Sequence, residues 1–376
     1  MSVVQADVQD TRMMQMCTNA KIIVCCGTGG VGKTSTAAAI AMMCARNGRK
    51  AVVVTIDPAR RLADAIGIDE SVGNEPHRVE LNAPGEMWVT MLHVRETFDG
   101  LIREVAPTAP KANEVINNSF YKNIAESISG TRDYMAAARL YSLYHDDRFD
   151  VVIVDTPPTR SALDFLDAPE RLARFLNHPI VRFLSAPARG GFRVVSFALT
   201  PVIRIIGKVV GSDALESAVS FLRAFDGMQD VLRDRALQVA SLLREKETSF
   251  VIVAAPQKEA LTEASYFVSE ISRLSLNLDA IVANRMPPRF GDLSVQDALV
   301  AAQRDSSNAE GFANLALLTA EADTADAVIE SFVASTRESV KTSGDIALTR
   351  AIERADDIHD LQGITQLADD LTVFSN

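Results

Sequence analysis

Residues 21–47 read KIIVCCGTGGVGKTSTAAAIAMMCARN, and this stretch decides the predicted fold. The apolar run at 21–26 is typical of a buried parallel strand. The Ala- and Met-rich segment at 34–47 indicates a helix, which Asn47-Gly48 would end. With the next apolar run at 51–56, the strand, turn and helix make up a βαβ unit of about 30 residues. The stretch therefore predicts an α/β protein.

Further apolar runs of the same kind follow along the chain, and helical patterns fill the intervals between them. These runs lie at residues 87–94, 151–154, 250–254 and 280–283. Strands buried on both faces read as short continuous apolar runs. The pattern thus predicts a mostly parallel sheet flanked by helices.

Two long stretches with helical patterns interrupt the strands, at about residues 96–150 and 161–249. Because most strands can be placed without them, we expect a single domain over residues 21–376 that carries two helical insertions. Residues 1–20 contain acids and lack the continuous apolar segment of a signal peptide. We expect them to form a flexible N-terminal arm.

The composition excludes some classes of partner. Hydrophobic residues make up 47% of the 376 residues, which is ordinary for a globular protein with a sizeable core. The formal net charge of -11 argues against a nucleic-acid partner, because such partners are bound through positive charge. The four cysteines form no C-x-x-C pair, so we expect reduced thiols in a cytoplasmic protein.

The turn GTGGVGKT at 27–34 matches the phosphate-binding pattern G-x-x-x-x-G-K-[ST], with the required strand before it and helix after it. Its glycines let backbone N–H groups surround phosphate oxygens, and the start of the helix adds a favourable dipole. Lys33 is expected to reach the β- and γ-phosphates, and the Thr34 hydroxyl to bind Mg²⁺. The predicted nucleotide-binding residues are Gly27, Thr28, Gly29, Gly30, Val31, Gly32, Lys33, Thr34 and Ser35.

An acid follows the apolar run at 151–154, in the sequence DTPPT. An acid at the carboxyl end of a buried strand lies at the edge where α/β folds bind ligands. Asp155 would hold Mg²⁺ beside Thr34, although an Asp in this place can also cap a helix. Thr156 and Pro158 belong to a stiff turn where a loop that senses the γ-phosphate could begin.

Two further strand ends carry polar residues. Asp57 follows the run at 51–56 and would either orient the attacking water or cap the next helix through Asp57-Pro58. Asn284 ends the last apolar run, and its amide suits the adenine edge, although a strand-end Asn is more often a turn residue. No N-K-x-D sequence is present, so nothing favours guanine.

The combination of GTGGVGKTST (27–36), TIDPAR (55–60), DTPPTRSALDFLDAP (155–169) and IVANR (281–285) resembles the ArsA-like ATPases, and most closely their paired actinobacterial members. This family includes the arsenite-pump ATPase and the eukaryotic factor that targets tail-anchored membrane proteins. The resemblance implies a Rossmann-like P-loop fold, ATP hydrolysis with Mg²⁺, and a dimer that closes over the nucleotide. It also implies that Asp57 positions the water, that residues 155–159 form switch II, and that Asn284 contacts adenine.

The chain departs from the family at residue 28. The family loop reads GKGGVGKT, and its first lysine crosses the dimer interface to the partner's phosphates, whereas this chain has Thr28. A cation acting in trans can be worth about 10³–10⁵ in rate. We therefore expect a homodimer to hydrolyse ATP slowly, and a paralogue that carries the lysine to complete the site in a heterodimer. The chain also lacks the family's metalloid-binding cysteines and zinc-binding C-x-x-C.

One basic and apolar stretch, residues 171–212, lies within this acidic chain and contains no Asp or Glu. Its longest apolar run without a charge, residues 194–203, is too short to cross a bilayer. A cationic amphipathic surface suits an apolar client segment or an anionic membrane, which would place the protein at the membrane periphery. The alternative is a set of helices that pack on the core with their arginines pointing outward. The basic residues are Arg171, Arg174, Arg182, Arg189, Arg193, Arg204 and Lys208.

Overall fold

The computed structural model describes residues 12–56, 73–119, 131–157, 227–340 and 346–372, with the single residues 62, 66, 121, 122, 167, 168, 170, 171, 173, 174, 217, 220, 221, 224 and 225. The chain divides into two compact units. The first consists of Met1–Met91, Leu143–Leu163 and Arg244–Asn376, and the second of Leu92–Ser142 and Asp164–Leu243.

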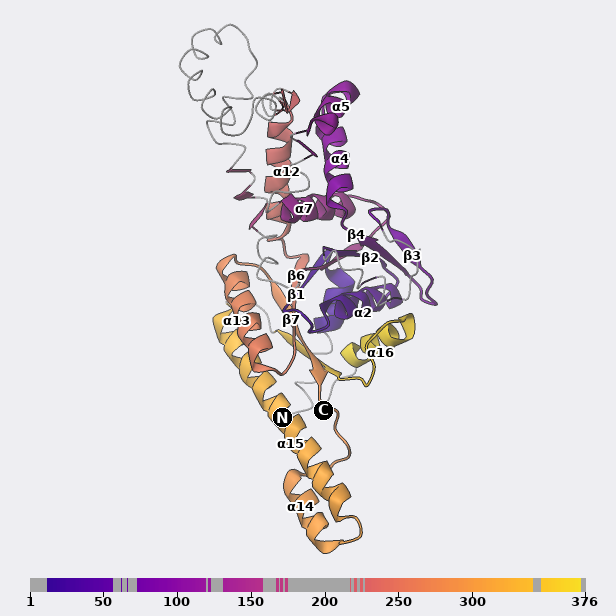
Figure 1. Ribbon diagram of the computed structural model, residues 1–376, viewed down its shortest axis with the longest axis vertical. Coiled ribbons are helices and arrows are strands. Elements are labelled where there is room, and N and C mark those ends of the chain that lie inside the picture. Colours follow the sequence, from indigo (N-terminus) through magenta and orange to yellow (C-terminus); the bar gives the residue numbers. More distant parts are fainter. Residues whose placement is uncertain are drawn as a thin grey trace. The chain divides into compact units, whose positions relative to one another are not determined.

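The first unit is built on an eight-stranded sheet in the order β3-β4-β2-β5-β1-β6-β7-β8 (Figure 1). All neighbouring strands are parallel except β3 and β4. The strands are β1 (Ile22–Gly27), β2 (Lys50–Thr55), β3 (His77–Val79), β4 (Glu86–Met91), β5 (Val151–Asp155), β6 (Thr248–Ala254), β7 (Leu278–Met286) and β8 (Ala347–Ile352). The predicted α/β fold with a mostly parallel sheet is confirmed.

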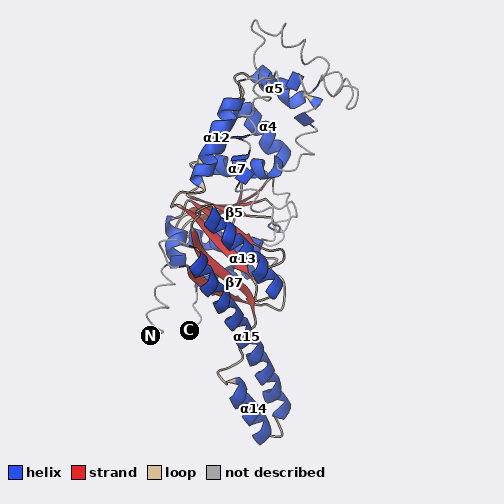
Figure 2. Ribbon diagram, turned by 90° about the vertical axis from the view of Figure 1, so that its left-hand side faces the viewer, coloured by secondary structure: helices blue, strands red, loops and turns tan. Residues whose placement is uncertain are grey.

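Helices cover both faces of this sheet. On one face lie α2 (Lys33–Arg46) and α16 (Leu361–Thr372), and on the other lie α13 (Lys258–Arg273) and α15 (Ala309–Ser339) (Figure 1). With α14 (Val295–Arg304), α15 forms a hairpin that extends beyond the sheet in both views (Figures 1 and 2). Parallel strands need such covering helices because both of their faces are apolar.

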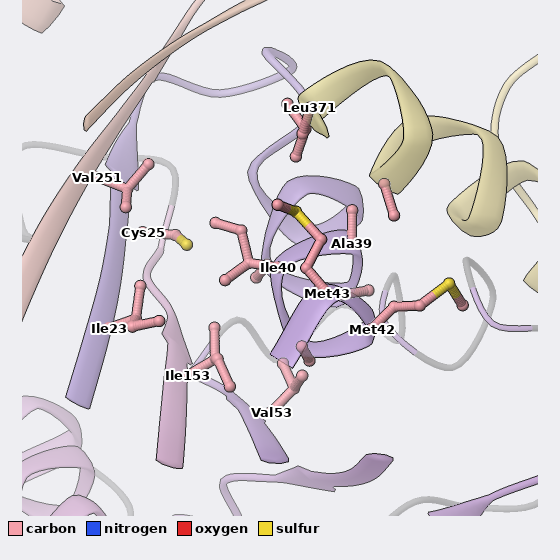
Figure 3. Close-up of a cluster of buried hydrophobic side chains, with 14 of the residues drawn as sticks. Ile23, Cys25, Ala39, Ile40, Met42, Met43, Val53, Ile153, Val251 and Leu371 are labelled. Atoms are coloured by element: carbon pink, nitrogen blue, oxygen red, sulfur yellow. The ribbon is translucent and has the colours of Figure 1, made fainter. Parts of the chain in front are cut away.

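A core of aliphatic and sulfur-containing side chains joins α2 to the sheet. Figure 3 shows Ile40 and Met43 of α2 between the strand residues Ile23 and Ile153 on one side and Leu371 of α16 on the other. All five are almost completely buried. This packing holds the first turn of α2 at the carboxyl end of β1.

Residues 12–19 differ from the expected flexible arm, because they form a helix. Met13, Met16 and Cys17 lie at positions i, i+3 and i+4, and all three are buried in the core of the first unit. One apolar helical face is therefore enough to order this segment. Residues 1–11 lie outside the described part of the chain.

The second unit consists of helices from the two predicted insertions: α4 (Val94–Val105), α5 (Ala109–Asn117), α7 (Thr131–Tyr144) and α12 (Gln229–Leu242). The two insertions bind each other. The Arg235 guanidinium donates to Glu104 at 2.8 Å, and the Tyr141 hydroxyl donates to Gln238 at 2.8 Å. The two insertions thus pack together as a compact unit of their own, and the single domain over residues 21–376 stays a prediction. Within the described ranges, none of the helices combines the length and the apolar composition that a membrane span requires.

Candidate nucleotide site at the carboxyl edge of the sheet

The glycine-rich loop joins β1 to α2, and two of its glycines are required by close contacts. A Cβ on Gly27 would lie 2.2 Å from the carbonyl oxygen of Val253 in β6. A Cβ on Gly32, whose φ is 87°, would lie 2.2 Å from Nδ2 of Asn284 in β7. Side chains at these positions would push the loop away from the sheet. The loop therefore lies directly on the carboxyl ends of β6 and β7.

The start of α2 has the features of an anion site. Its N-cap is Gly32, no side chain caps the helix, and its first turn contains no acid. The Lys33 ammonium is buried, with 6% of the residue exposed, and donates to the carbonyl oxygen of Thr28 at 2.5 Å. This bond folds the lysine back across its own loop. A helix N-terminus and a buried ammonium then face the same space, which favours a phosphate there.

Thr34 and Asp155 meet as predicted. The Thr34 hydroxyl donates to Oδ2 of Asp155 at 2.7 Å, and the Thr55 hydroxyl at the end of β2 donates to the same oxygen at 2.9 Å. Asp155 is only 1% exposed. Hydroxyl and carboxylate oxygens are the donors that Mg²⁺ prefers, so Thr34 and Asp155 fit a magnesium ion. Thr55 was missed by the sequence analysis, and its place as the last residue of an apolar strand was the available signal.

Residues beneath the loop hold together β1 and β5, two central strands of the sheet. The buried Thr156 hydroxyl donates to the carbonyl oxygen of Cys25 at 2.7 Å, which ties the first residue after β5 to β1. Burial raises the pKa of the Cys25 thiol well above its ordinary value and the pKa of Cys26 to about 12. Both thiols are therefore neutral at pH 7 and act as small apolar side chains beneath the loop.

Asn284 lies against the loop. Its amide Nδ2 donates to the carbonyl oxygen of Val31 at 2.8 Å, and only 9% of the residue is exposed. The residue thus supports the loop from β7, a contact between residues 253 positions apart in the chain. The sequence predicts Asn284 at this edge of the sheet but does not reveal this hydrogen bond. Its contact with adenine stays a prediction.

An open pocket of 390 Å³ adjoins the loop on the side of β6 and α13. It is lined by Thr28, Gly29, Gly30, Val31, Ala255, Gln257, Glu259, Ala260, Glu263 and Arg285. The glycine-rich loop and the first turns of α13 thus line the same pocket.

Ser35 is half-buried in the first turn of α2. Asp57 and Pro158 lie outside the described residues, so their predicted roles stay predictions.

Comparison with known proteins extends these observations. The family model described as anion-transporting ATPase matches residues 20–305. Among curated relatives, the ATPase GET3 of Malassezia globosa is 27% identical over 280 residues, covering 71% of this chain and 74% of the relative. The ATPase ARSA2 of Chlamydomonas reinhardtii is 26% identical, covering 74% and 72%. The ATPase ASNA1 homolog 2 of Paramecium tetraurelia is 22% identical, covering 69% and 74%. The chain is therefore an ATPase that belongs to the anion-transporting, ArsA-like family.

Proposed function

We propose that the chain binds Mg²⁺ and ATP at this edge of the sheet and works as a dimeric, ATP-driven conformational switch. The observation that carries the proposal is the pair formed by Thr34 and Asp155, whose oxygens are 2.7 Å apart at the start of α2. A hydroxyl from the phosphate-binding loop and a buried carboxylate from β5 are the two protein groups that a magnesium–nucleotide site needs. The family membership and the GET3 relative support the same assignment.

The chain's own residues divide the chemistry among them. The backbone N–H groups of residues 27–35 bind the phosphates, and Lys33 places a buried positive charge against the β- and γ-phosphates. Bound magnesium would neutralise developing negative charge, held by Thr34 and Asp155. Asp57 positions the attacking water and Asn284 contacts the adenine. Thr156 and Pro158 carry the response to the γ-phosphate away from the site as part of switch II.

Residue 28 sets the expected rate. Thr28 is 7% exposed, and its carbonyl oxygen is bonded to Lys33. Its short neutral side chain cannot carry a positive charge to the phosphates of a neighbouring subunit. We propose that a paralogue with lysine at this place completes the site in a heterodimer, and that a homodimer turns ATP over slowly.

Steady-state ATPase measurements test this proposal. The isolated chain is expected to bind ATP but to hydrolyse it slowly, and the Thr28→Lys variant is expected to be at least tenfold faster. Co-purification of the natural partner should produce a similar increase. Brisk turnover by the isolated wild-type chain, unchanged in Thr28→Lys, would end the heterodimer proposal. Absence of ATP binding would end the functional proposal as a whole.

Thr28 also favours a second candidate function, a regulatory subunit that holds ATP with little turnover. In that case the purified chain would retain bound nucleotide, and hydrolysis would stay low even with the partner present.

A partitioning-type positioning ATPase is a third candidate, because that group shares the P-loop. Both the isolated chain and its complex with the partner therefore need to be assayed for bound nucleotide and for the rate of ATP hydrolysis.

We further propose that residues 171–212 bind an apolar client segment, an anionic membrane surface or a transport partner. The support is their charge, with seven basic and no acidic residues in an otherwise acidic chain. Most of these residues lie outside the described ranges. Four buried cysteines, all free thiols, agree with a cytoplasmic location. Co-sedimentation with anionic vesicles, with and without ATP, would separate membrane binding from client binding.

A further inference from the structure

The strand that carries Asn284 is irregular at one point. Between the pairs Ala283–Arg350 and Met286–Ile352, β7 has two residues where β8 has one, Ala351. Two residues opposite one is the count of a β-bulge, and bulges next to functional sites redirect a side chain. The two residues on β7 are Asn284 and Arg285.

Arg285 also has an unusual backbone conformation. Its φ is 57°, in the left-handed region that residues other than glycine seldom adopt. Such conformations persist where the surrounding structure enforces them, and they concentrate at functional sites. Here the bulge places Asn284 under the loop, bonded to Val31, and turns Arg285 toward solvent with 43% of its side chain exposed.

The surroundings of Arg285 are electrostatically unbalanced. It lines the same pocket as Thr28, Gly29 and Gly30, and the other charged residues of this pocket are Glu259 and Glu263. Two carboxylates beside a phosphate-binding loop repel a triphosphate. Arg285, on β7, supplies the positive charge among the residues that line this pocket, and it lines the pocket together with the loop that lacks a lysine at residue 28.

The guanidinium of Arg285 is only weakly held. Among the described residues its ion pair is with Asp357 at 3.9 Å, and the Asp357 side chain is 99% exposed. An exposed pair at that distance contributes little free energy. The side chain can therefore leave Asp357 and reach a ligand at the loop without a large loss.

We propose that Arg285 contacts the γ-phosphate of ATP bound to its own chain and supplies, in cis, part of the positive charge that Thr28 does not provide. The inference rests on the proposed ATP site and deepens it. It attributes the ATP turnover that the isolated chain retains without a lysine at residue 28 to this arginine. It also predicts that the site prefers ATP over ADP, because only ATP carries the phosphate that Arg285 would contact.

The test compares four purified full-length proteins: wild type, Arg285→Ala, Arg285→Lys and Arg304→Ala. Arg304 is the last residue of α14 and is exposed, so its replacement removes the same charge away from the loop. ATP and ADP dissociation constants are measured with a fluorescent nucleotide, and ATP turnover is measured at low salt. Circular dichroism and thermal unfolding establish that each variant is folded.

A charged hydrogen bond is worth about 1.5–3 kcal/mol, or roughly 10- to 150-fold. We expect Arg285→Ala to lose that factor in kcat/KM and in ATP affinity, with a change in ADP affinity several-fold smaller. Arg285→Lys should retain part of the function, and Arg304→Ala should match wild type. In the double variant Arg285→Ala, Thr28→Lys, a loop cation should restore at least tenfold in turnover.

Two results would overturn the assignment while leaving the ATP site intact. One is a folded Arg285→Ala protein that binds and hydrolyses ATP like wild type. The other is an equal loss for ATP and ADP, which would mean that Arg285 only shapes the pocket. If wild type binds no ATP at all, the proposed function itself fails, so the two failures are distinguishable.

Discussion

Replacement of Gly32 by alanine tests whether the loop is held against the sheet by Asn284. The substitution has two costs. A left-handed backbone at φ 87° costs an alanine about 1–2 kcal/mol, and its Cβ would lie 2.2 Å from Nδ2 of Asn284. Relief of that overlap requires the amide to move, which breaks its 2.8 Å bond to the buried Val31 carbonyl. A buried carbonyl without its partner costs about 1–3 kcal/mol.

A double-mutant cycle separates these two costs. Gly32→Ala is made in the wild-type chain and in Asn284→Ala, where the overlapping amide is absent. The alanine should then cost about 1–3 kcal/mol less in the second background, or roughly 5- to 150-fold in ATP affinity. Gly30→Ala is the control, because its φ is 79° and its Cβ would meet nothing within 4 Å. Its effect should be the same in both backgrounds.

The assay measures the ATP dissociation constant and the free energy of unfolding without nucleotide for each variant. If the loop of the nucleotide-free variant relaxes away from Asn284, the ATP dissociation constant rises, because bound phosphates force the loop back against the sheet. If the loop does not relax, the free energy of unfolding falls instead. The sum of the two changes is the quantity to compare. Additive effects of Gly32→Ala and Asn284→Ala, within about 0.5 kcal/mol, would refute the contact.

Three further predictions concern side chains that are buried or partly buried. Thr34→Val should weaken magnesium-dependent ATP binding by about 1.5–3 kcal/mol, because it removes the hydroxyl that lies 2.7 Å from Asp155 and would bind Mg²⁺ with it. Thr34→Ser keeps a hydroxyl and should restore the binding in a titration of Mg²⁺. All four cysteines should resist iodoacetamide at pH 8 in the native protein and react in urea, because all four are buried; at Cys26 burial also raises the pKa to about 12. Rapid labelling of the native protein, counted by mass spectrometry, would contradict this. Burial also raises the pKa of Asp279, so its charged form opposes folding at pH 7. Asp279→Asn should raise the melting temperature at pH 7, and this gain should vanish below the ordinary pKa of an aspartate; an equal gain at all pH values would count against the explanation.

Much of the sheet could be predicted because its strands are local apolar runs. The strands β1, β2, β5, β6 and β7 all lie within a few residues of the predicted ranges. β8 was missed, since Thr349 and Arg350 interrupt its apolar pattern. Arg350 is tolerated there because it forms ion pairs with Asp326 and Glu330 of α15. Such compensation is invisible in the sequence of the strand itself.

The site divides in the same way. The sequence by itself determined the glycine-rich loop between β1 and α2, because strand, glycines, lysine and helix are adjacent in the chain and their geometry is local. It also determined that Asp155 would meet Thr34, since parallel strands bring their carboxyl ends to one edge. Only the tertiary structure decided which distant residues support that loop: Thr55 on the carboxylate and Asn284 on Val31. The bulge and strand pairings that set these contacts depend on long-range register, which no local pattern encodes.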